Sequence, residues 1–232
     1  MKNWIGVTVA ASGRPRLLLG KLKTGETCFI EDIDMDSKIH TMYGHEFDLM
    51  DPQGADVDIQ DIAHALSRIQ RWGGHTIQPH SVAIHSIHCQ EIAKSWGFGA
   101  DYQMWALMHD GAEAYIGDIV HPFKRNLATV LDAEIKIENT IGEALIPGGK
   151  LMTGGMVKNF DEFSSAVEQI HPNIRGLART LPGYERYAVD MCNAIDFNVW
   201  TWEARQSAEK ARLDFLRRYF GLKEILNKSD PE

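Results

Sequence analysis

The sequence predicts a mainly α-helical protein with a small β element at its N-terminus. Beyond about residue 51, apolar residues recur at helical spacing, as at Ile59, Ile62 and Leu66. Residues 1–50 instead combine short apolar runs with turn-forming residues, which is typical of strands and hairpins. We therefore expect a β-rich element over residues 1–50 and a helical domain over residues 51–232, with residues 146–187 as a flexible insertion.

The N-terminal strands are expected where apolar runs flank turn residues. Runs at residues 5–9 and 16–19 flank the turn at 12–15, and residues 27–30 could add a third strand. A second hairpin is expected from residues 38–42 and 46–49, which lie on either side of Gly44. Residues 51–54 then form a linker.

The helices are expected from apolar periodicity and from capping residues. Asp56 or Asp58 can cap the first helix, and Gly73 with Gly74 can end it. Pro122 suits the first turn of a later helix. The expected helices cover residues 57–72, 81–96, 101–115, 122–145, 160–170 and 184–220, the last as one long helix or two abutting ones.

Composition excludes several classes of protein. The formal net charge of −8 argues against a stable nucleic-acid complex, which needs a cationic surface. Cys28, Cys89 and Cys192 are odd in number and lack Cys-x-x-Cys spacing, so neither a disulfide framework nor a thiolate zinc site is indicated. The N-terminus resembles a strand and not a signal peptide, and no run approaches the ~18–20 apolar residues of a membrane span. We expect a cytoplasmic protein.

The segment HDGAEAYIGD at residues 109–118 carries the most specific chemistry. Adjacent helical residues point about 100° apart, so His109 and Asp110 share a target only if both lean toward one small object. A divalent metal is such an object, because imidazole and carboxylate are its ordinary ligands. Glu113 lies one turn later and is placed to activate a water molecule at the metal. After Gly117, Asp118 can fold back toward the site.

Further ligands are expected from other helices. Of the ten histidines, His85 lies within a helix among apolar residues of the inner face, with His88 as its rival one turn later. Asp196 lies in the middle of an apolar stretch, where an unpaired carboxylate would cost several kcal/mol. Asp190 is its competitor, on nearly the opposite side of that helix.

These motifs together resemble the HD-domain 5′-deoxynucleotidases and the related phage-encoded deoxynucleoside triphosphohydrolases. The resemblance covers about residues 40–145 and 188–206, and the fourteen-residue step from Arg71 to His85 agrees with it. It implies that the helical domain is an HD-domain bundle, and that the expected compartment is the host cytoplasm if the chain is phage-encoded. The supporting strings are RW at 71–72, HSVAIHS at 80–86, HDGAEAYIGDIVHPFK at 109–124 and DFNVWTWEAR at 196–205.

The resemblance also implies a role for each site residue. His85, His109, Asp110 and Asp196 would hold one divalent metal. Glu113 would activate water, and Asp118 would support the site as a second catalytic residue. Arg71 and Lys124 would contact phosphate, and Trp72 would pack against the base or sugar. Two neutral imidazoles and two carboxylates suit Mn²⁺, Co²⁺, Fe²⁺ or Zn²⁺ better than Mg²⁺. A second ion, Mg²⁺, could accompany the substrate phosphates.

The expected function is metal-dependent hydrolysis of 2′-deoxynucleoside 5′-phosphates, with an adenine nucleotide (dATP or dAMP) as first choice. The products would be the deoxynucleoside with triphosphate or phosphate, and the sequence does not separate these two reactions. The expected partner is a small-molecule deoxynucleotide, without a membrane, and the chain is expected to form a homo-oligomer. The alternative is a catalytically inactive HD protein that binds nucleotide and regulates a partner; an intact Glu113 and Asp118 favour the enzyme.

Overall fold

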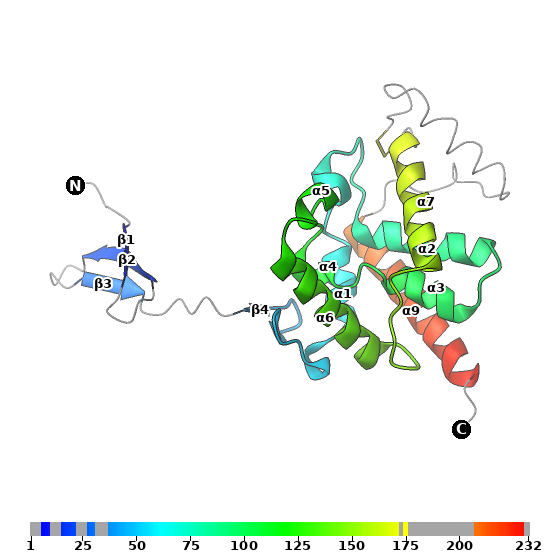
Figure 1. The fold of residues 1–232 in the computed structure, drawn as a ribbon, viewed down its shortest axis with the longest axis horizontal. Coiled ribbons are helices and arrows are strands. Elements are labelled where there is room, and N and C mark those ends of the chain that lie inside the picture. The colour runs from blue at the N-terminus through cyan, green and yellow to red at the C-terminus, as the bar shows by residue number, and fades with distance from the viewer. Residues whose placement is uncertain are drawn as a thin grey trace. The chain divides into compact units, whose positions relative to one another are not determined.

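A computed structural model describes residues 6–9, 15–21, 27–30, 37–171, 174–175 and 207–229. The fold is mainly helical with small antiparallel sheets in the N-terminal part, so the predicted fold class, a helical bundle with a small β element, is confirmed (Figure 1). The chain divides into two compact units, residues 1–38 and 39–232. Within the described ranges, no helix has the length and apolar character needed to cross a membrane.

The first unit contains a three-stranded antiparallel sheet in the order β1-β2-β3. Its strands are β1 (Gly6–Val9), β2 (Pro15–Lys21) and β3 (Thr27–Ile30), as the apolar runs predict. Val7 pairs with Leu17, Leu18 pairs with Phe29, and the register shifts between Leu18 and Gly20.

The second unit begins with the hairpin of β4 (Lys38–His40) and β5 (Glu46–Asp48), which the sequence also predicts. Asp61 on α1 holds the turn of this hairpin: its carboxylate accepts hydrogen bonds from the Thr41 hydroxyl (2.7 Å) and the Tyr43 amide (2.9 Å) and lies 2.8 Å from His45 Nδ1. Phe47 is fully buried and stacks on Tyr115, with 3.8 Å between ring centroids. Residues 39–50 therefore pack with the helices that follow them.

The first long helix is shorter than the predicted 57–72. After the 3-10 turn η1 (Gly54–Asp56), α1 (Ile59–Leu66) begins at the N-cap Asp58, whose side chain accepts from the Gln60 amide. The chain then leaves the helix because backbone groups of Ile69 and Arg71 bond to Val82 and His80, at 3.0 and 2.9 Å. This pairing lies between segments distant from each other in sequence, so helical periodicity could not predict it.

A short 3-10 segment, η2 (Arg71–Gly74), follows α1 and leads toward α2. Trp72 has φ +61° and ψ +24°, a left-handed conformation that is uncommon for a residue other than glycine. Strained backbone of this kind persists only where surrounding contacts hold it, and such positions cluster at functional sites.

The central helices are α2 (Val82–Ser95), capped by Ser81, and α3 (Ala100–Met108). The expected helix over residues 101–115 is wrong in its second half, because α3 ends at Met108 and α4 (Glu113–Ile116) starts only after a turn. A Cβ on Gly111 would lie 3.0 Å from the Met108 carbonyl oxygen, so this tight turn favours glycine. The helix expected over 122–145 is likewise two helices, α5 (His121–Lys124) and α6 (Ala128–Leu145).

Residues 156–170 form the helix α7 (Met156–Ile170), which packs against α2. The helix expected over residues 160–170 is therefore present and begins four residues earlier, so residues 156–170 of the expected flexible insertion 146–187 are a packed helix and not a flexible loop. Apolar contacts hold α7 in place, because its Phe160, Phe163 and Val167 lie in one buried cluster with Cys89, Ile92, Ala93 and Ala106. The expected helix at 184–220 lies outside the described residues up to 206; beyond them, α9 covers Ala208–Ser229.

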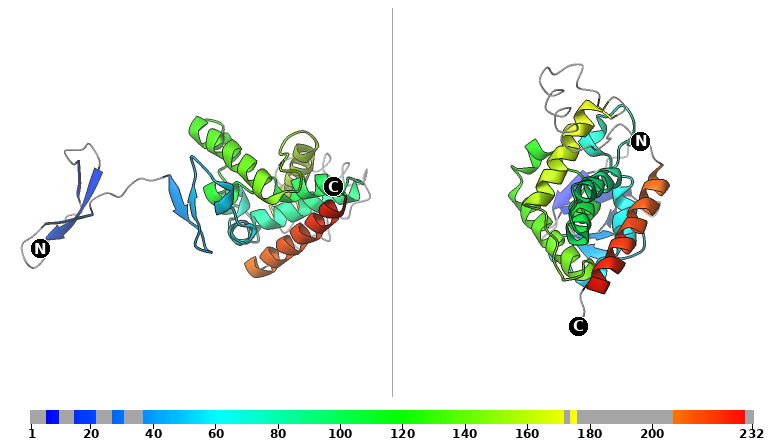
Figure 2. Two further views of the ribbon diagram at one scale, coloured as in Figure 1. Left: turned by 90° about the horizontal axis from the view of Figure 1, so that it is seen from below. Right: turned by 90° about the vertical axis from the view of Figure 1, so that its right-hand side faces the viewer.

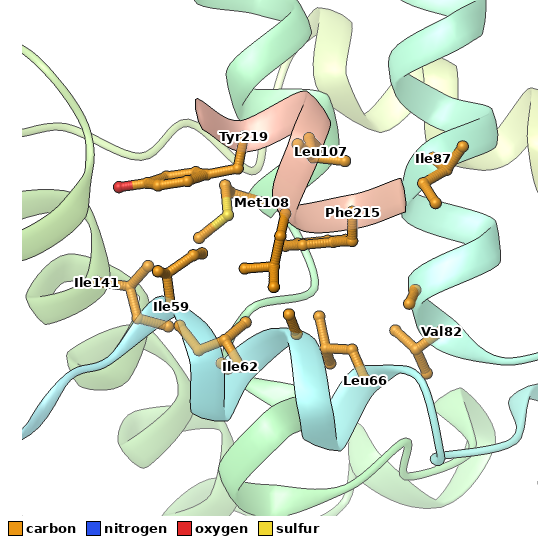
Figure 3. Close-up of a cluster of buried hydrophobic side chains, with 14 of the residues drawn as sticks. Ile59, Ile62, Leu66, Val82, Ile87, Leu107, Met108, Ile141, Phe215 and Tyr219 are labelled. Carbon is orange, nitrogen blue, oxygen red and sulfur yellow. The ribbon is translucent and has the colours of Figure 1, made fainter. Parts of the chain in front are cut away.

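The main hydrophobic core lies where α9 crosses α1, α2 and α3, as three views of the bundle show (Figures 1 and 2). Phe215 and Tyr219 of α9 point toward Ile59, Ile62 and Leu66 of α1 (Figure 3). Leu107 and Met108 at the end of α3 and Ile141 of α6 complete this cluster. Burial of Met108 fixes the end of α3 and so positions the next two residues, His109 and Asp110.

Candidate metal centre

The turn after α3 presents His109 with one ring nitrogen already engaged. His109 is buried, and its Nδ1 lies 2.9 Å from the Ala106 carbonyl oxygen, to which an Nδ1–H can donate. Its Nε2 makes no hydrogen bond to any described residue, although Asp110 Oδ1 lies 3.2 Å away. A buried imidazole Nε2 without a hydrogen-bond partner is suited to metal ligation, because a proton held on Nδ1 leaves the Nε2 lone pair available.

His85 on α2 is the second imidazole of the candidate site and lies beside His109. Its side chain is fully buried and its ring centroid lies 5.3 Å from that of His109. Nδ1 of His85 lies 2.6 Å from Glu168 Oε1, while Nε2 faces Asp161 Oδ1 at 3.1 Å and Asp110 Oδ2 at 3.7 Å. Both imidazoles therefore direct Nε2 toward the same pair of carboxylates.

His88, the rival of His85, lies elsewhere. It is buried beside His80, with 5.7 Å between ring centroids, and could join His80 and Glu168 in a separate ligand group. Burial and the neighbouring His80 hold the pKa of His88 well below its usual range. A third possible group, His45 with Asp58 and Asp61, supports the hairpin and α1 described above.

The donor atoms around His85 and His109 fit one divalent ion. Ligands at about 2.0–2.2 Å from one metal lie about 3 to 3.5 Å apart when adjacent, and about 4 Å apart when opposite. The distances from the two Nε2 atoms to Asp110 and Asp161 range from 3.1 to 4.0 Å. Cys89 also offers a sulfur, 3.4 Å from His85 Nε2, and belongs to a possible ligand group with His85 and His109. The protein thus contains buried side chains that could bind a metal.

Asp161 on α7 is the site residue that sequence reasoning missed. Its Oδ1 lies 3.1 Å from Nε2 of His85 and 4.0 Å from Nε2 of His109. Although burial opposes its ionisation, the bond and charge of His85 keep the pKa of Asp161 below its usual range. Asp196, the ligand expected from a later helix, lies outside the described residues, as does its competitor Asp190.

A polar stripe on α7 could have indicated Asp161. Asp161, Ser164, Ser165 and Glu168 recur at spacings of three, four and seven residues, which puts them on one helical face. Phe160, Phe163 and Val167 are buried beside them, so the stripe belongs to a helix packed against the bundle. The glycines at residues 148, 149, 154 and 155 instead suggested a loop, and α7 begins directly after them.

Glu113 and Asp118 face the same site from α4 and from the segment after it. Burial, with the charges of Asp110 and Asp118, raises the pKa of Glu113 well above its usual range, and Glu113 Oε2 has no hydrogen-bond partner among the described residues. Burial and Asp110 also raise the pKa of the half-buried Asp118, against the opposing charge of Arg71. Gly117, with φ +78°, makes the turn that brings Asp118 back, as the sequence predicts.

Arg71 lies between Asp110 and α7. Its Nε donates to Glu168 Oε2 at 3.0 Å and its Nη2 donates to the Ser165 hydroxyl at 2.9 Å. Nη1 lies 3.5 Å from Asp110 Oδ2. Two of the three guanidinium nitrogens are therefore bonded to α7, while Nη1 faces the Asp110 carboxylate.

A cavity of about 840 Å³ opens over this site. Trp72 forms part of its wall, with the Arg175 guanidinium 4.6 Å from the centroid of the indole ring. Lys124 lines another part and is paired with Glu134 of α6. The cavity is also bordered by Arg71, His109, Asp110, Glu113, Asp118 and Asp161. The cavity size is typical of a small-molecule site (~300–1,000 Å³).

Comparisons with known proteins indicate relatives but not a function. The chain is 39% identical over 85 residues to an uncharacterized protein of Rhodobacter capsulatus, covering 35% of this chain and 43% of that protein. It is 37% identical over 107 residues to the uncharacterized protein YfdR of Escherichia coli, covering 46% of this chain and 57% of YfdR. The matched parts thus span about half the length of these curated relatives. No family model matches the chain.

Proposed function

We propose that this protein is a metal-dependent phosphohydrolase of the HD type, acting on 2′-deoxynucleoside 5′-phosphates. The observation that carries the proposal is the convergence of two buried imidazole Nε2 atoms, those of His85 and His109, on two carboxylates that line a substrate-sized cavity. An unligated cluster of this kind would leave His109 Nε2 without a partner in the interior, which is costly.

His85, His109, Asp110 and Asp161 would hold the ion, with Asp196 as the further ligand proposed from sequence. When bound, a divalent metal neutralises phosphate charge and lowers the pKa of a water molecule. Mixed imidazole and carboxylate donors favour Mn²⁺, Co²⁺, Fe²⁺ or Zn²⁺ over Mg²⁺.

Glu113 would accept the proton from the attacking water. The pKa of Glu113 lies above its usual range, so its carboxylate is a stronger base than that of an ordinary glutamate. Asp118, whose charge contributes to that shift after burial and Asp110, would help to set the basicity of Glu113. Within the described residues, neither Glu113 nor Asp118 forms an ion pair with a cationic side chain, so both carboxyls are free to take part in proton transfer.

Substrate binding would use the cations and the aromatic wall of the cavity. Arg71 Nη1 faces the Asp110 carboxylate and would clamp a phosphate oxygen bound there. Lys124, Lys158 and Arg175 line the same cavity and could neutralise a longer phosphate tail. Trp72 would stack on the base or sugar of an adenine deoxynucleotide. We propose that this activity operates on free nucleotides in the cytoplasm.

Product analysis tests the proposal directly. The metal-free protein is incubated with each of the four deoxynucleoside mono- and triphosphates after addition of Mn²⁺ or Co²⁺. We expect deoxynucleoside plus either orthophosphate from monophosphates or inorganic triphosphate from triphosphates. A His85→Ala variant should lose both metal and turnover. No turnover of any nucleotide, together with tight nucleotide binding, would instead support a regulatory HD protein.

A further inference from the structure

Glu168 on α7 is a fully buried carboxylate that borders no part of the cavity. Each of its oxygens takes separate partners. Oε1 lies 2.6 Å from His85 Nδ1 and 3.1 Å from His80 Nε2, and Oε2 accepts from Arg71 Nε at 3.0 Å and from Trp72 Nε1 at 2.8 Å. A buried carboxylate is tolerated when it is paired in this way, and removal of one partner is then costly.

The Oε1 side determines which nitrogen of His85 is available. A carboxylate 2.6 Å from Nδ1 keeps a proton on that nitrogen, so Nε2 is the nitrogen left for a metal, which would displace the proton that Nε2 shares with Asp161 in the metal-free protein. Nε2 in turn faces Asp161 at 3.1 Å and Asp110 at 3.7 Å. Partners of this kind orient a ligating ring and raise its basicity.

The Oε2 side determines the direction of two cavity residues. It holds Arg71 by Nε, so that Nη1 is left toward Asp110. It also holds the indole of Trp72, whose backbone is in the left-handed region at φ +61°. One carboxylate thereby connects a residue of the metal centre with two residues of the substrate wall.

We propose that Glu168 is the positioning residue of this site, aligning His85 for the metal and Arg71 with Trp72 for the substrate. The inference rests on the proposed function. Glu168 does not border the cavity, so it acts on the site through three of its partners, His85, Arg71 and Trp72; its other two partners, His80 and Ser164, help to hold the carboxylate in place. A purely structural ion pair between α7 and η2 would stabilise the fold without changing metal affinity.

The first test compares Glu168→Gln with Glu143→Gln, an exposed change on α6. Folding is checked by circular dichroism, and metal affinity is measured by titration of the metal-free proteins with Zn²⁺ or Co²⁺. We expect about 10- to 100-fold weaker metal binding for Glu168→Gln only, the size typical of outer partners of metal ligands. With a nucleotide that the wild type hydrolyses, KM should also rise, because Arg71 and Trp72 lose their common anchor. Wild-type metal affinity in a folded Glu168→Gln protein would overturn the positioning role.

A second measurement does not depend on the variant folding. Nitrogen-15 NMR of the wild-type imidazoles reports which ring nitrogen carries a proton. We expect a proton on Nδ1 of His85 both with and without Zn²⁺, hydrogen-bonded to Glu168. A His85 ring protonated on Nε2 alone would overturn the inference. If the wild type bound no metal, the proposed function would fail. If the wild type bound metal but Glu168→Gln bound it equally well, only the positioning role of Glu168 would fail.

Discussion

The helical unit contains two buried regions that are stabilised in different ways. Around α1 and α9 the interior is apolar, with Phe215, Tyr219, Ile62 and Leu66 in mutual contact (Figure 3). Around Glu168 of α7, where it meets His85 of α2 and Arg71, the interior is instead charged and hydrogen-bonded. The apolar region depends on area and shape and tolerates small rearrangements. The charged region depends on individual partners, so it specifies directions of side chains, which is what a metal and substrate site needs.

Helix α6 contributes both to the apolar core and to the cavity beside the charged region. Ile137 and Ile141 face the apolar core, whereas Glu134 and Glu138 on the same helix border the cavity. Changes in the first region should therefore reduce stability, and changes in the second should alter metal binding, turnover or pH dependence. Four substitutions test this division.

Phe215→Ala should have the largest effect on stability. The ring is fully buried in the apolar core, and loss of such a side chain costs about 3–5 kcal/mol in the free energy of unfolding. Denaturant unfolding measures the change. Leu213→Ala on the same helix, 52% exposed, is the control and should shift stability by less than about 0.5 kcal/mol. Equal effects of the two changes would contradict this assignment of the core.

Glu113→Gln should leave fold and metal content unchanged while lowering turnover about 100-fold or more, the size of a typical general-base contribution. Gln keeps the shape of Glu113 but cannot take up a proton. Metal analysis of the purified variant and steady-state kinetics measure the two quantities, with Glu143→Gln as control. If metal were lost together with turnover, Glu113 would be a ligand and not the base.

Asp161→Asn should weaken metal binding at least about 10-fold, since even outer partners of metal ligands contribute that much. The amide keeps the size of the side chain but removes the charge that faces both imidazoles. Titration with Co²⁺ compares this variant with Asp196→Asn, the ligand that the sequence predicts. If Asp161→Asn bound Co²⁺ as tightly as the wild type while Asp196→Asn did not, the fourth ligand would be Asp196 and not Asp161.

Glu138→Gln should have the smallest effect, visible as a pH dependence of stability. Burial, with Glu134 adding repulsion, raises the pKa of Glu138 to about 7 from its ordinary 4.5. The folded protein thus holds a proton that the unfolded chain releases, so the wild type loses stability as pH rises from about 4.5 to beyond 7. Glu138 is partly exposed, which reduces the loss to about 1 kcal/mol. Relative to the wild type, Glu138→Gln should gain this amount between pH 5 and pH 8 in denaturant unfolding; a constant difference would contradict the shift.

Much of the local structure follows from the sequence. Helix α1 starts at the predicted cap Asp58, α2 lies within one residue of its predicted bounds, and both N-terminal hairpins pair where apolar runs flank turns. These features depend on neighbours within a few residues, namely capping side chains, turn residues and periodicity. The pairing of His109 with Asp110, and the turn at Gly117 that returns Asp118, are local in the same sense.

Tertiary structure alone decided the rest of the site. The end of α1 depends on backbone bonds between Ile69 and Val82 and between Arg71 and His80, and the end of α3 on the burial of Met108. Asp161 and Glu168 reach the site because α7 packs on α2, far away in sequence. Periodicity identifies which face of a helix is buried but not which other helix covers it. The sequence by itself therefore determined the helices and the His109–Asp110 motif, and only the packing of α7 against α2 determined which carboxylates surround His85.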